Sequence, residues 1–417
     1  MKKYFYIATN CCAVQRSETY RIENFFIKNG WLETTECALS DINIITTCGV
    51  TNDIEESSFC MIDRVAKQAK ASSKLIVSGC LPNICIDNLR MRYPQAIFIP
   101  LDQLEGFDSL ISATYKIRDV TYNNNARHHH SKGDPRLEED LYADELIVAE
   151  SLSQKFADDR ILQAYNYATP GRYLWKDNSI FEVKISSGCN NNCSYCASRF
   201  GVGRYRSKAL EKIKKEVEDG LSQGYQMFML MGDELGDYGC DIGLSLVDVL
   251  KLCVEIEPNI QIGIRYIHPD KLVELFNYLK VYLKNIFFCC ISIQSASPRV
   301  LEKMNRIYNM NEVEAIIKNL NLNYSHIFLH TQIIIGFPNE SEDDFVKTIN
   351  FLQRCKFDFI RYNVFSPRKI TQAYSYKIVY TPVELERRIE TMKHFCEGNR
   401  IERLYRRYCS IISEKQV

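Results

Sequence analysis

The sequence predicts an α/β protein with an N-terminal doubly wound parallel-sheet domain, then a partial (β/α)6 barrel and a helical C-terminal tail. Short apolar runs alternate with amphipathic helical stretches through residues 1–117, and six more strand candidates separated by helical patterns fill residues 179–380. Residues 381–417 continue with a helical pattern alone. Alternation of strands and helices produces parallel sheets covered by helices, so these three observations set the fold class.

Length, charge and cysteine content narrow the class of protein. The chain has 417 residues, of which 46% are hydrophobic and 25% charged, as in a folded protein of two or three domains. Its 52 Lys and Arg balance 52 Asp and Glu, so no global positive charge attracts nucleic acid. The 17 cysteines are too sparse for a disulfide scaffold, and no export signal or membrane-length apolar run is visible. We therefore expect a cytoplasmic protein without a membrane partner, in which reduced cysteines bind metal or act in catalysis.

The N-terminal domain takes its strands from four apolar runs and its helices from the stretches between them. The expected strands are residues 4–9, 42–47, 74–79 and 96–100. The expected helices are residues 18–29, 54–69 and 86–93. Ser17 is the expected N-cap of the first helix. Residues 118–178 lose this alternation, so we expect a polar linker with some helix there.

The barrel domain contains six apolar strand candidates separated by helical segments. They are residues 181–186, 226–231, 260–265, 286–293, 327–335 and 358–365. Six βα units in about 200 residues fall short of the eight units of a closed barrel, so we expect an open, partial barrel.

Three cysteines stand at CxxxCxxC spacing directly after the first barrel strand: Cys189, Cys193 and Cys196. Three thiolates on one loop bind three irons of a [4Fe–4S] cluster and leave the fourth iron open. Half of a zinc site at Cys193 and Cys196 is the alternative, but zinc needs a second ligand pair and the sequence has no other CxxC. The spacing and the position at a strand end favour the cluster.

CxxxCxxC with an aromatic residue before its last cysteine, opening a six-stranded βα barrel, resembles the radical S-adenosylmethionine (SAM) enzymes. The resemblance implies that the open iron binds the amino and carboxylate groups of SAM, which one electron then splits into methionine and a 5′-deoxyadenosyl radical. That radical abstracts hydrogen from an unactivated carbon. Tyr195 would lie beside the adenine of SAM, although a packing role for its ring is equally physical.

A second set of cysteines lies in the first domain, each where a predicted strand ends and a helix begins: Cys11, Cys48 and Cys80. In a doubly wound parallel sheet the loops at these ends converge at the carboxyl edge, the usual ligand crevice. Three unrelated buried thiols are the alternative, because free cysteine is among the most buried residue types.

Local sequences around these cysteines and along the barrel resemble the radical SAM methylthiotransferases that modify tRNA or ribosomal protein S12. The matching segments, in chain order over residues 2–375, are KKYFYIATNCC, NIITTCGVTNDIEES, LIVSGCLPN, KISSGCNNNCSYC, GRYRSK, LMGDELGDYGCD, IQSASPRVLEKMNR, IIIGFPNESEDDF and FSPRKITQA. The resemblance implies that Cys11, Cys48 and Cys80 hold an auxiliary [4Fe–4S] cluster that carries the transferred sulfur. It also implies conversion of C–H to C–SCH3 with two SAM molecules, and an electron donor such as flavodoxin or ferredoxin.

Five barrel residues are expected to contact SAM at the C-terminal face, where (β/α) barrels form their active sites. They stand at predicted strand ends: Gly232, Asp233, Arg265, Gln294 and Gly336. A glycine there permits close backbone approach to a ligand, and Arg265 is suited to pair with the SAM carboxylate. Loop turns and a surface ion pair are the alternative.

The sequence departs from the family pattern at several positions. Cys12 stands beside Cys11 and is an alternative ligand of the auxiliary cluster, although Cys11 fits better when counted from the strand. Ser198-Arg199 replaces the usual Ile-Pro after the third cluster cysteine. In the fourth strand, Ser292-Ile293 replaces the usual Pro, and Ala296 replaces a Gly just beyond it. These changes line the cavity, so we expect a substrate unlike the usual ones.

The C-terminal segment is a further departure, because family members generally end in a small β-barrel (TRAM) domain used with tRNA or ribosomal protein. Here the segment is helical, and its arginines form either a basic face or, preferably, the solvent side of a packed amphipathic helix. Without a strand-rich tail or net positive charge, we expect a peptide or protein substrate, such as a ribosomally made precursor peptide, with tRNA as the alternative. Two other readings stay open: an N-terminal cluster that is only an electron relay, and a non-catalytic iron–sulfur or zinc protein acting as a redox-responsive binding module.

Overall fold

The computed structural model describes residues 2–120 and 180–397, which form two compact units. The first unit contains residues 2–120, 187–205 and 366–374 of the described chain. The second contains residues 180–186, 206–365 and 375–397. The segments 187–205 and 366–374 therefore leave the chain of the second unit and pack as parts of the first.

The first unit is built on a five-stranded sheet in the order β2-β1-β3-β4-β5, with every neighbouring pair parallel. Its strands are β1 (Tyr4–Thr9), β2 (Leu32–Glu33), β3 (Ile42–Thr47), β4 (Lys74–Gly79) and β5 (Ile97–Pro100). Its helices are α1 (Ala13–Lys28), α2 (Asn52–Gln68), α3 (Leu81–Arg92), α4 (Gly106–Leu110) and the short α7 (Ser198–Gly201). All six residues of β3 are buried, as expected for a central parallel strand covered on both faces.

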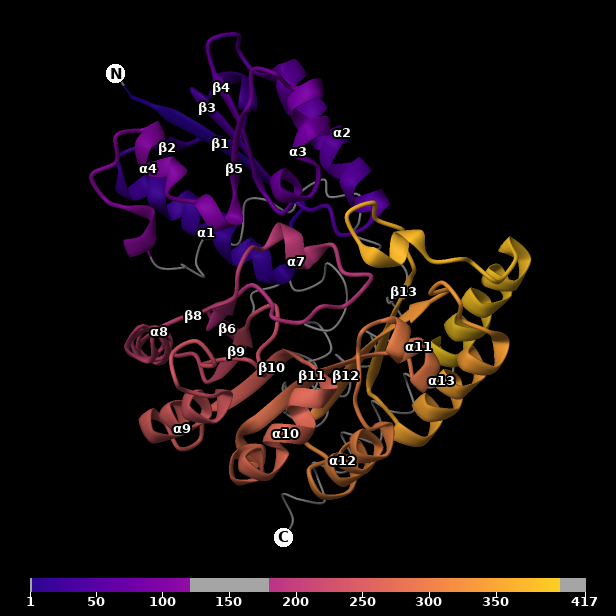
Figure 1. The fold of residues 1–417 in the computed structure, drawn as a ribbon. Helices are drawn as coiled ribbons and strands as arrows, with labels where there is room; N and C mark the ends of the chain where they lie inside the picture. Colours follow the sequence, from indigo (N-terminus) through magenta and orange to yellow (C-terminus); the bar gives the residue numbers. More distant parts are fainter. Residues whose placement is uncertain (1, 121–179, 398–417) are drawn as a thin grey trace. The chain divides into compact units, whose positions relative to one another are not determined.

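Each face of this sheet has its own hydrophobic core. Phe25 and Phe26 of α1 pack with β1 and β3 residues in one core. Ile62 of α2 and Leu81 of α3 pack with Ile45 of β3 in the other. The unit is therefore doubly wound, with helices on both sides of the sheet (Figure 1).

The second unit is built on a six-stranded parallel sheet whose spatial order follows the chain, β6-β9-β10-β11-β12-β13. Its strands are β6 (Ile180–Lys184), β9 (Met227–Met231), β10 (Gln261–Ile267), β11 (Ile286–Gln294), β12 (Phe328–Ile335) and β13 (Phe359–Val364). Its helices are α8 (Leu210–Ser222), α9 (Leu246–Ile256), α10 (Pro269–Leu279), α11 (Pro298–Lys303), α12 (Met310–Asn323) and α13 (Glu342–Cys355). β6 and β13 are the two edges of this sheet, so the barrel is open.

Alternate residues of these strands pack outward against the helices. Val183, Leu230 and Ile264 belong to one large core together with residues of α8, α9, α10, α12 and α13, and the helices line that side of the sheet in Figure 1. The opposite face is called here the lumen face, because it is the inner face of the partial barrel. Its floor is apolar, with the rings of Phe288 and Phe328 stacked at 5.9 Å and 7° between planes.

The fold class predicted from the sequence is confirmed, and each predicted strand coincides with an observed one within two residues at its start. Ser17 as an N-cap is wrong, because α1 begins at Ala13 with Cys12 as its N-cap, and the Ser17 hydroxyl donates to the Val14 carbonyl inside the helix. Most of the predicted linker and the tail beyond residue 397 lie outside the described residues, while residues 382–397 are helical as predicted. The three boundaries between the four predicted segments stay a prediction. Among the described residues no helix is long and apolar enough to cross a membrane.

Candidate functional site: two sets of thiols

Cys11, Cys48 and Cys80 lie at the carboxyl ends of three neighbouring strands, β1, β3 and β4. Each is only 2% exposed. The carbonyl oxygen of Thr47 connects them, because it accepts from the Cys11 thiol at 3.5 Å and from the Cys80 backbone N–H at 2.9 Å. The sheet therefore brings these three cysteines together at its carboxyl edge, as the spacing predicts.

Neighbouring polar groups fix the backbone of these loops. The Cys48 N–H donates to the Asn10 side-chain oxygen at 3.0 Å, and the Ser58 hydroxyl donates to the Cys48 carbonyl at 2.7 Å. Gly79 has φ +97°, and a Cβ there would stand 2.2 Å from the Thr47 carbonyl oxygen. Only glycine permits this close crossing, so the turn that presents Cys80 depends on it.

Cys11 and Cys12 are adjacent in the loop after β1 but have different environments. Cys11 is buried, whereas Cys12 is exposed and begins α1. The geometry thus places Cys11 with the other two strand-end thiols and leaves Cys12 at the surface.

The CxxxCxxC loop forms a tight turn followed by α7. Cys193 is buried, Cys189 and Cys196 are half-buried, and the Cys196 N–H donates to the Cys193 carbonyl at 3.2 Å. Burial, and then the neighbouring Cys193, raise the pKa of the Cys196 thiol, while backbone N–H groups at the start of α7 lower it. Tyr195 is half-buried on the same turn, and its placement beside adenine stays a prediction.

The loop carrying Cys189, Cys193 and Cys196 leads into α7, which packs against Cys80. A Cβ built on Gly201 would stand 2.6 Å from the Cβ of Cys80, so α7 touches the start of α3 through bare backbone. The Asn83 side chain donates to the Gly201 carbonyl at 3.4 Å and to Asp102 at 2.9 Å, which holds this contact in place. Both thiol sets therefore belong to one compact unit.

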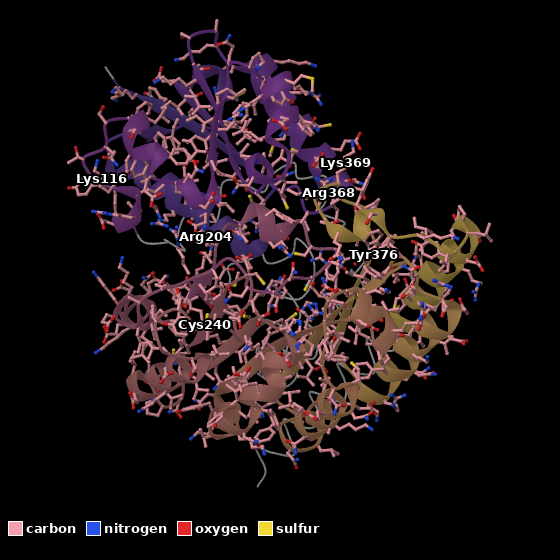
Figure 2. All side chains as sticks on the ribbon, in the orientation of Figure 1. Lys116, Arg204, Cys240, Arg368, Lys369 and Tyr376 are labelled. Carbon is pink, nitrogen blue, oxygen red and sulfur yellow. The ribbon has the colours of Figure 1, made fainter. Side chains whose placement is uncertain are left out.

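The segment after β13 also joins this unit and contacts both cysteine loops. Arg368 is 6% exposed and donates to the side chain of Asn52 at 2.7 Å and to that of Glu55, both at the start of α2 (Figure 2). The Ser366 hydroxyl accepts from the Asn52 N–H at 2.9 Å. Further on, the Ala373 N–H donates to the carbonyl of Ser194, between Cys193 and Tyr195, at 2.8 Å. One short segment thus connects the loop of Cys48 with the CxxxCxxC loop.

The chemistry of both donor sets fits iron–sulfur clusters. Each set consists of thiols, the ligand type that such clusters use, and each cysteine binds a different iron. In the described chain no three His, Cys, Asp or Glu side chains are close enough to hold a single metal ion. A cluster spreads its ligands over several irons, so this spacing is compatible with a cubane and unlike a zinc site.

The five barrel residues predicted to contact SAM all lie at or near the carboxyl ends of the second unit's strands. Gly232 and Asp233 follow β9, Gln294 ends β11 with φ 67°, and Gly336 follows β12 with φ 72°. Arg265 lies two residues before the end of β10, which runs on to Ile267, so its predicted position as the strand end is wrong. It is 3% exposed and faces away from the helices. The role of these residues toward SAM stays a prediction.

A buried carboxyl beside this edge was missed by the sequence analysis. Glu234 is 4% exposed and accepts from the N–H groups of Gly236 at 2.8 Å and His268 at 3.1 Å. Burial raises the pKa of Glu234 to about 7, and burial lowers the pKa of His268 to about 2. The signal was the acidic residue directly after Gly232-Asp233 in the sequence.

Two family models match the chain: one described as the uncharacterised protein family UPF0004, over residues 4–99, and one described as the radical SAM superfamily, over residues 183–352. A probable threonylcarbamoyladenosine tRNA methylthiotransferase of Pyrococcus horikoshii is 26% identical, over 89% of this chain and 79% of the relative. A tRNA-2-methylthio-N(6)-dimethylallyladenosine synthase of Dictyoglomus thermophilum is 28% identical, over 93% and 81%. A ribosomal protein uS12 methylthiotransferase of Natranaerobius thermophilus is 27% identical, over 88% and 76%.

Among solved structures, the radical SAM methyltransferase TsrM of Kitasatospora setae has a TM-score of 0.56 and 11% identity, covering 90% of this chain and 77% of TsrM. That likeness concerns the fold alone. Three findings point to the same family. They are the order of the two family models, the two thiol sets, and the relatives that match along most of the chain. The chain belongs to the radical SAM methylthiotransferase family.

Proposed function

We propose that this chain converts a C–H bond of a macromolecular substrate to C–SCH3. Family membership supports methylthio transfer. The observation that carries the proposal is the contact of Gly201 with Cys80, which holds the CxxxCxxC loop against the other thiol set. Hydrogen abstraction and sulfur delivery must reach the same carbon, so their two centres need to be neighbours.

The thiols have separate roles in this proposal. Cys189, Cys193 and Cys196 would hold the cluster that binds SAM, and Cys11, Cys48 and Cys80 would hold the auxiliary cluster. When bound, the clusters and SAM supply one-electron chemistry, the sulfur and the methyl group. The chain positions them: the strand ends bury the Cys11, Cys48 and Cys80 thiols to 2% exposure, which excludes water from the sulfur atoms.

For the substrate we propose a tRNA adenosine. The relatives from P. horikoshii and D. thermophilum are named as tRNA-modifying enzymes, whereas the one from N. thermophilus is named for ribosomal protein uS12. The preference for a peptide or protein substrate, drawn from the balanced charge and the helical tail, is not confirmed by these names. A protein substrate is the second candidate, which the uS12 enzyme favours.

Mass spectrometry of cells with and without the gene tests the substrate. Digested tRNA should contain a methylthioadenosine derivative that disappears on deletion and returns with the wild-type gene but not with Cys193→Ala. A methylthio group found instead on a ribosomal protein or a small peptide would replace tRNA with the protein candidate.

Iron content tests the two-cluster arrangement. Anaerobically reconstituted protein should hold about eight irons, and changing Cys189, Cys193 and Cys196 together to Ala should leave about four. Zinc in place of iron would favour the binding-module reading. Two intact clusters together with 5′-deoxyadenosine formation but no methylthio product would favour the electron relay.

The remaining partners follow from the chemistry of the thiols. Cysteine binds iron as a thiolate, so the protein must work where thiols stay reduced, as in the cytoplasm. An electron donor such as flavodoxin or ferredoxin completes the proposal.

A further inference from the structure

The lumen face of the second unit carries basic side chains and a histidine. Ile264, Ile360 and Leu329 pack outward in the helix-covered core. Residues next to them in a strand point to the opposite face, so Arg265, Arg361 and His330 lie on the lumen face.

His330 lies on β12, next to the edge strand β13, and its ring nitrogens lack polar partners within the described residues. It is 1% exposed, and neither ring nitrogen has a hydrogen-bond partner within the described residues. Its ring packs instead against Phe288 and Phe359, at 5.9 Å and 5.5 Å between centroids. Burial, then Arg265 and Arg361, hold the pKa of His330 well below its usual range, so the imidazole is neutral and offers one N–H donor. Buried polar groups almost always have partners, so a ligand or water must complete this one.

Arg361 stands one step nearer the carboxyl end of the sheet. Its register partner on β12 is Gln332, whereas that of His330 is Phe359 on β13. Arg361 is half-buried and forms no hydrogen bond or ion pair with any described residue. On the helix side, Arg354 and Arg388 both have carboxylate partners, Glu314 at 2.8 Å and Glu340 at 3.2 Å. An inward-facing arginine without such a partner is suited to bind an anion.

The two lumen arginines act on the same region. Both Arg265 and Arg361 lower the pKa of Cys290, which burial raises to about 12, and Glu234 has the opposite effect. Cys290 is the register partner of His330. Positive charge therefore gathers around His330.

Further charged side chains lie around this face. Lys184 and Glu182 lie on the lumen side of β6, since Phe181 and Val183 pack outward. Arg306 and Asp237 also act on Glu234, with opposite effects on its pKa. Because burial raises the pKa of Glu234 to about 7, that carboxyl is only partly ionised at neutral pH.

Side chains pack tightly on the lumen face near the amino ends of the strands. A Cβ on Gly263 would stand 2.5 Å from the side chain of Met229, and Phe288 and Phe328 stack beside it. A ligand therefore approaches His330 and Arg361 from the carboxyl ends of the strands, the side on which Gly232 and Gly336 lie.

We propose that Arg361 and His330 form an anion subsite that receives a carboxylate of the substrate, carried on the substituent of the target adenosine. The proposal rests on the proposed function and selects, within it, adenosines with an acidic substituent such as threonylcarbamoyl over those with an apolar one. SAM also has a carboxylate. The cluster loop follows β6, however, and Arg361 is on β13, at the other edge of the sheet, with four strands between them. That order favours the substrate as the source.

Two RNA stem–loops test the subsite. They are identical except that the target adenosine carries a threonylcarbamoyl group in one and a dimethylallyl group in the other. The anaerobically reconstituted full chain should bind the threonylcarbamoyl stem–loop about tenfold more tightly, as measured by fluorescence anisotropy. Arg361→Gln should abolish this ratio, and Arg361→Lys should keep part of it because the charge remains. His330→Phe, which keeps a ring between Phe288 and Phe359, should reduce the ratio.

A matched control distinguishes a local effect of Arg361 on RNA affinity from a general effect of the protein's net charge. Arg354→Gln removes the same charge from the helix side and should leave both affinities unchanged. SAM affinity, measured by isothermal titration calorimetry, should be equal in wild type and Arg361→Gln.

Any of the following outcomes would contradict the proposed subsite. An unchanged ratio in Arg361→Gln removes the role of Arg361, an equal loss for both RNAs makes it a phosphate contact, and weaker SAM binding assigns it to the SAM carboxylate. If wild type binds neither stem–loop and binds an acidic uS12 peptide instead, the tRNA proposal fails along with it. If the wild type binds both stem–loops equally and still methylthiolates tRNA in cells, the subsite alone is wrong.

Discussion

The guanidinium group of Arg368 binds the carboxylate of Glu55 across 313 residues of chain, and both side chains are largely buried, at 7% and 19% exposure. Glu55 lies at the start of α2, the helix that follows Cys48, and Arg368 lies in the segment that also reaches Ser194. This ion pair therefore ties the segment after β13 to the thiol-bearing edge of the first unit.

Arg368→Gln should lower the free energy of unfolding by about 3 kcal/mol, because it leaves the Glu55 carboxylate buried without its cation. Equilibrium urea unfolding at pH 7 measures the change. Arg387→Gln breaks an exposed pair with Glu342, at 56% and 42% exposure, and should cost no more than about 0.5 kcal/mol.

The double variant Glu55→Leu with Arg368→Met should recover most of that loss, since apolar side chains of similar size replace both charges. A double variant less stable than Arg368→Gln alone would mean that Arg368 acts through Asn52 rather than Glu55.

Gly201→Ala should weaken iron binding by Cys11, Cys48 and Cys80, because the added methyl group would stand 2.6 Å from the Cβ of Cys80. The measurement is iron per chain in a background in which Cys189, Cys193 and Cys196 are Ala, where about four irons are expected before the change. Gly106→Ala is the control, since its Cβ meets Ile99 at an ordinary 3.5 Å. Full iron retention in Gly201→Ala would show that α7 moves away at no cost to the thiols.

Cys11→Ser should remove the irons that remain in that same background, while Cys12→Ser should leave them. Cys11 is buried at the strand end, and Cys12 is exposed at the start of α1. Iron analysis and the visible absorption of the reconstituted proteins give the answer. Loss of iron in Cys12→Ser alone would make Cys12 the ligand.

Glu234 should make the protein less stable as pH rises from about 4.5 to 7. Burial raises the pKa of this carboxyl from 4.5 in the unfolded chain to about 7 in the folded one, so the folded state holds the proton more tightly. Its stabilising effect is complete below pH 4.5 and is lost as the pH passes through 7, with an overall change of roughly 3 kcal/mol. Urea unfolding at pH 4.5 and 7.5 should show this loss in wild type and a smaller loss in Glu234→Gln, which keeps the acceptor for Gly236. Equal losses in both proteins would place the pH dependence elsewhere.

Local pattern was sufficient for the ten predicted strands and for the position of both thiol sets, but it missed the two-residue β2. Runs such as INIITT and MFMLM are apolar throughout because their strands are buried on both faces, and cysteines at their ends must meet at one edge. The family resemblance added the expected role of each set: one holds the cluster that binds SAM, and the other holds the auxiliary cluster. These predictions use only short-range pattern and strand order.

Long-range packing was beyond the reach of the sequence. Nothing near Arg368 in the chain indicates that its partner is Glu55, and nothing near Gly201 indicates Cys80. Arg361 looks like one polar residue in a strand, and its lumen position depends on which face the helices cover. Ser17 has the chemistry of an N-cap, but the helix starts earlier, because the residues before it already pack inward.

The assembly of the first unit from three separate stretches has a consequence for biosynthesis. A ribosome that has released residues 2–120 has provided the whole five-stranded sheet, yet α7 and Arg368 are still to come. Cys80 can gain its contact with α7 once residue 201 has been made, whereas Glu55 lacks its cation until Arg368 follows. The contacts that complete the thiol-bearing edge of the first unit therefore form in two steps after its sheet has been synthesised.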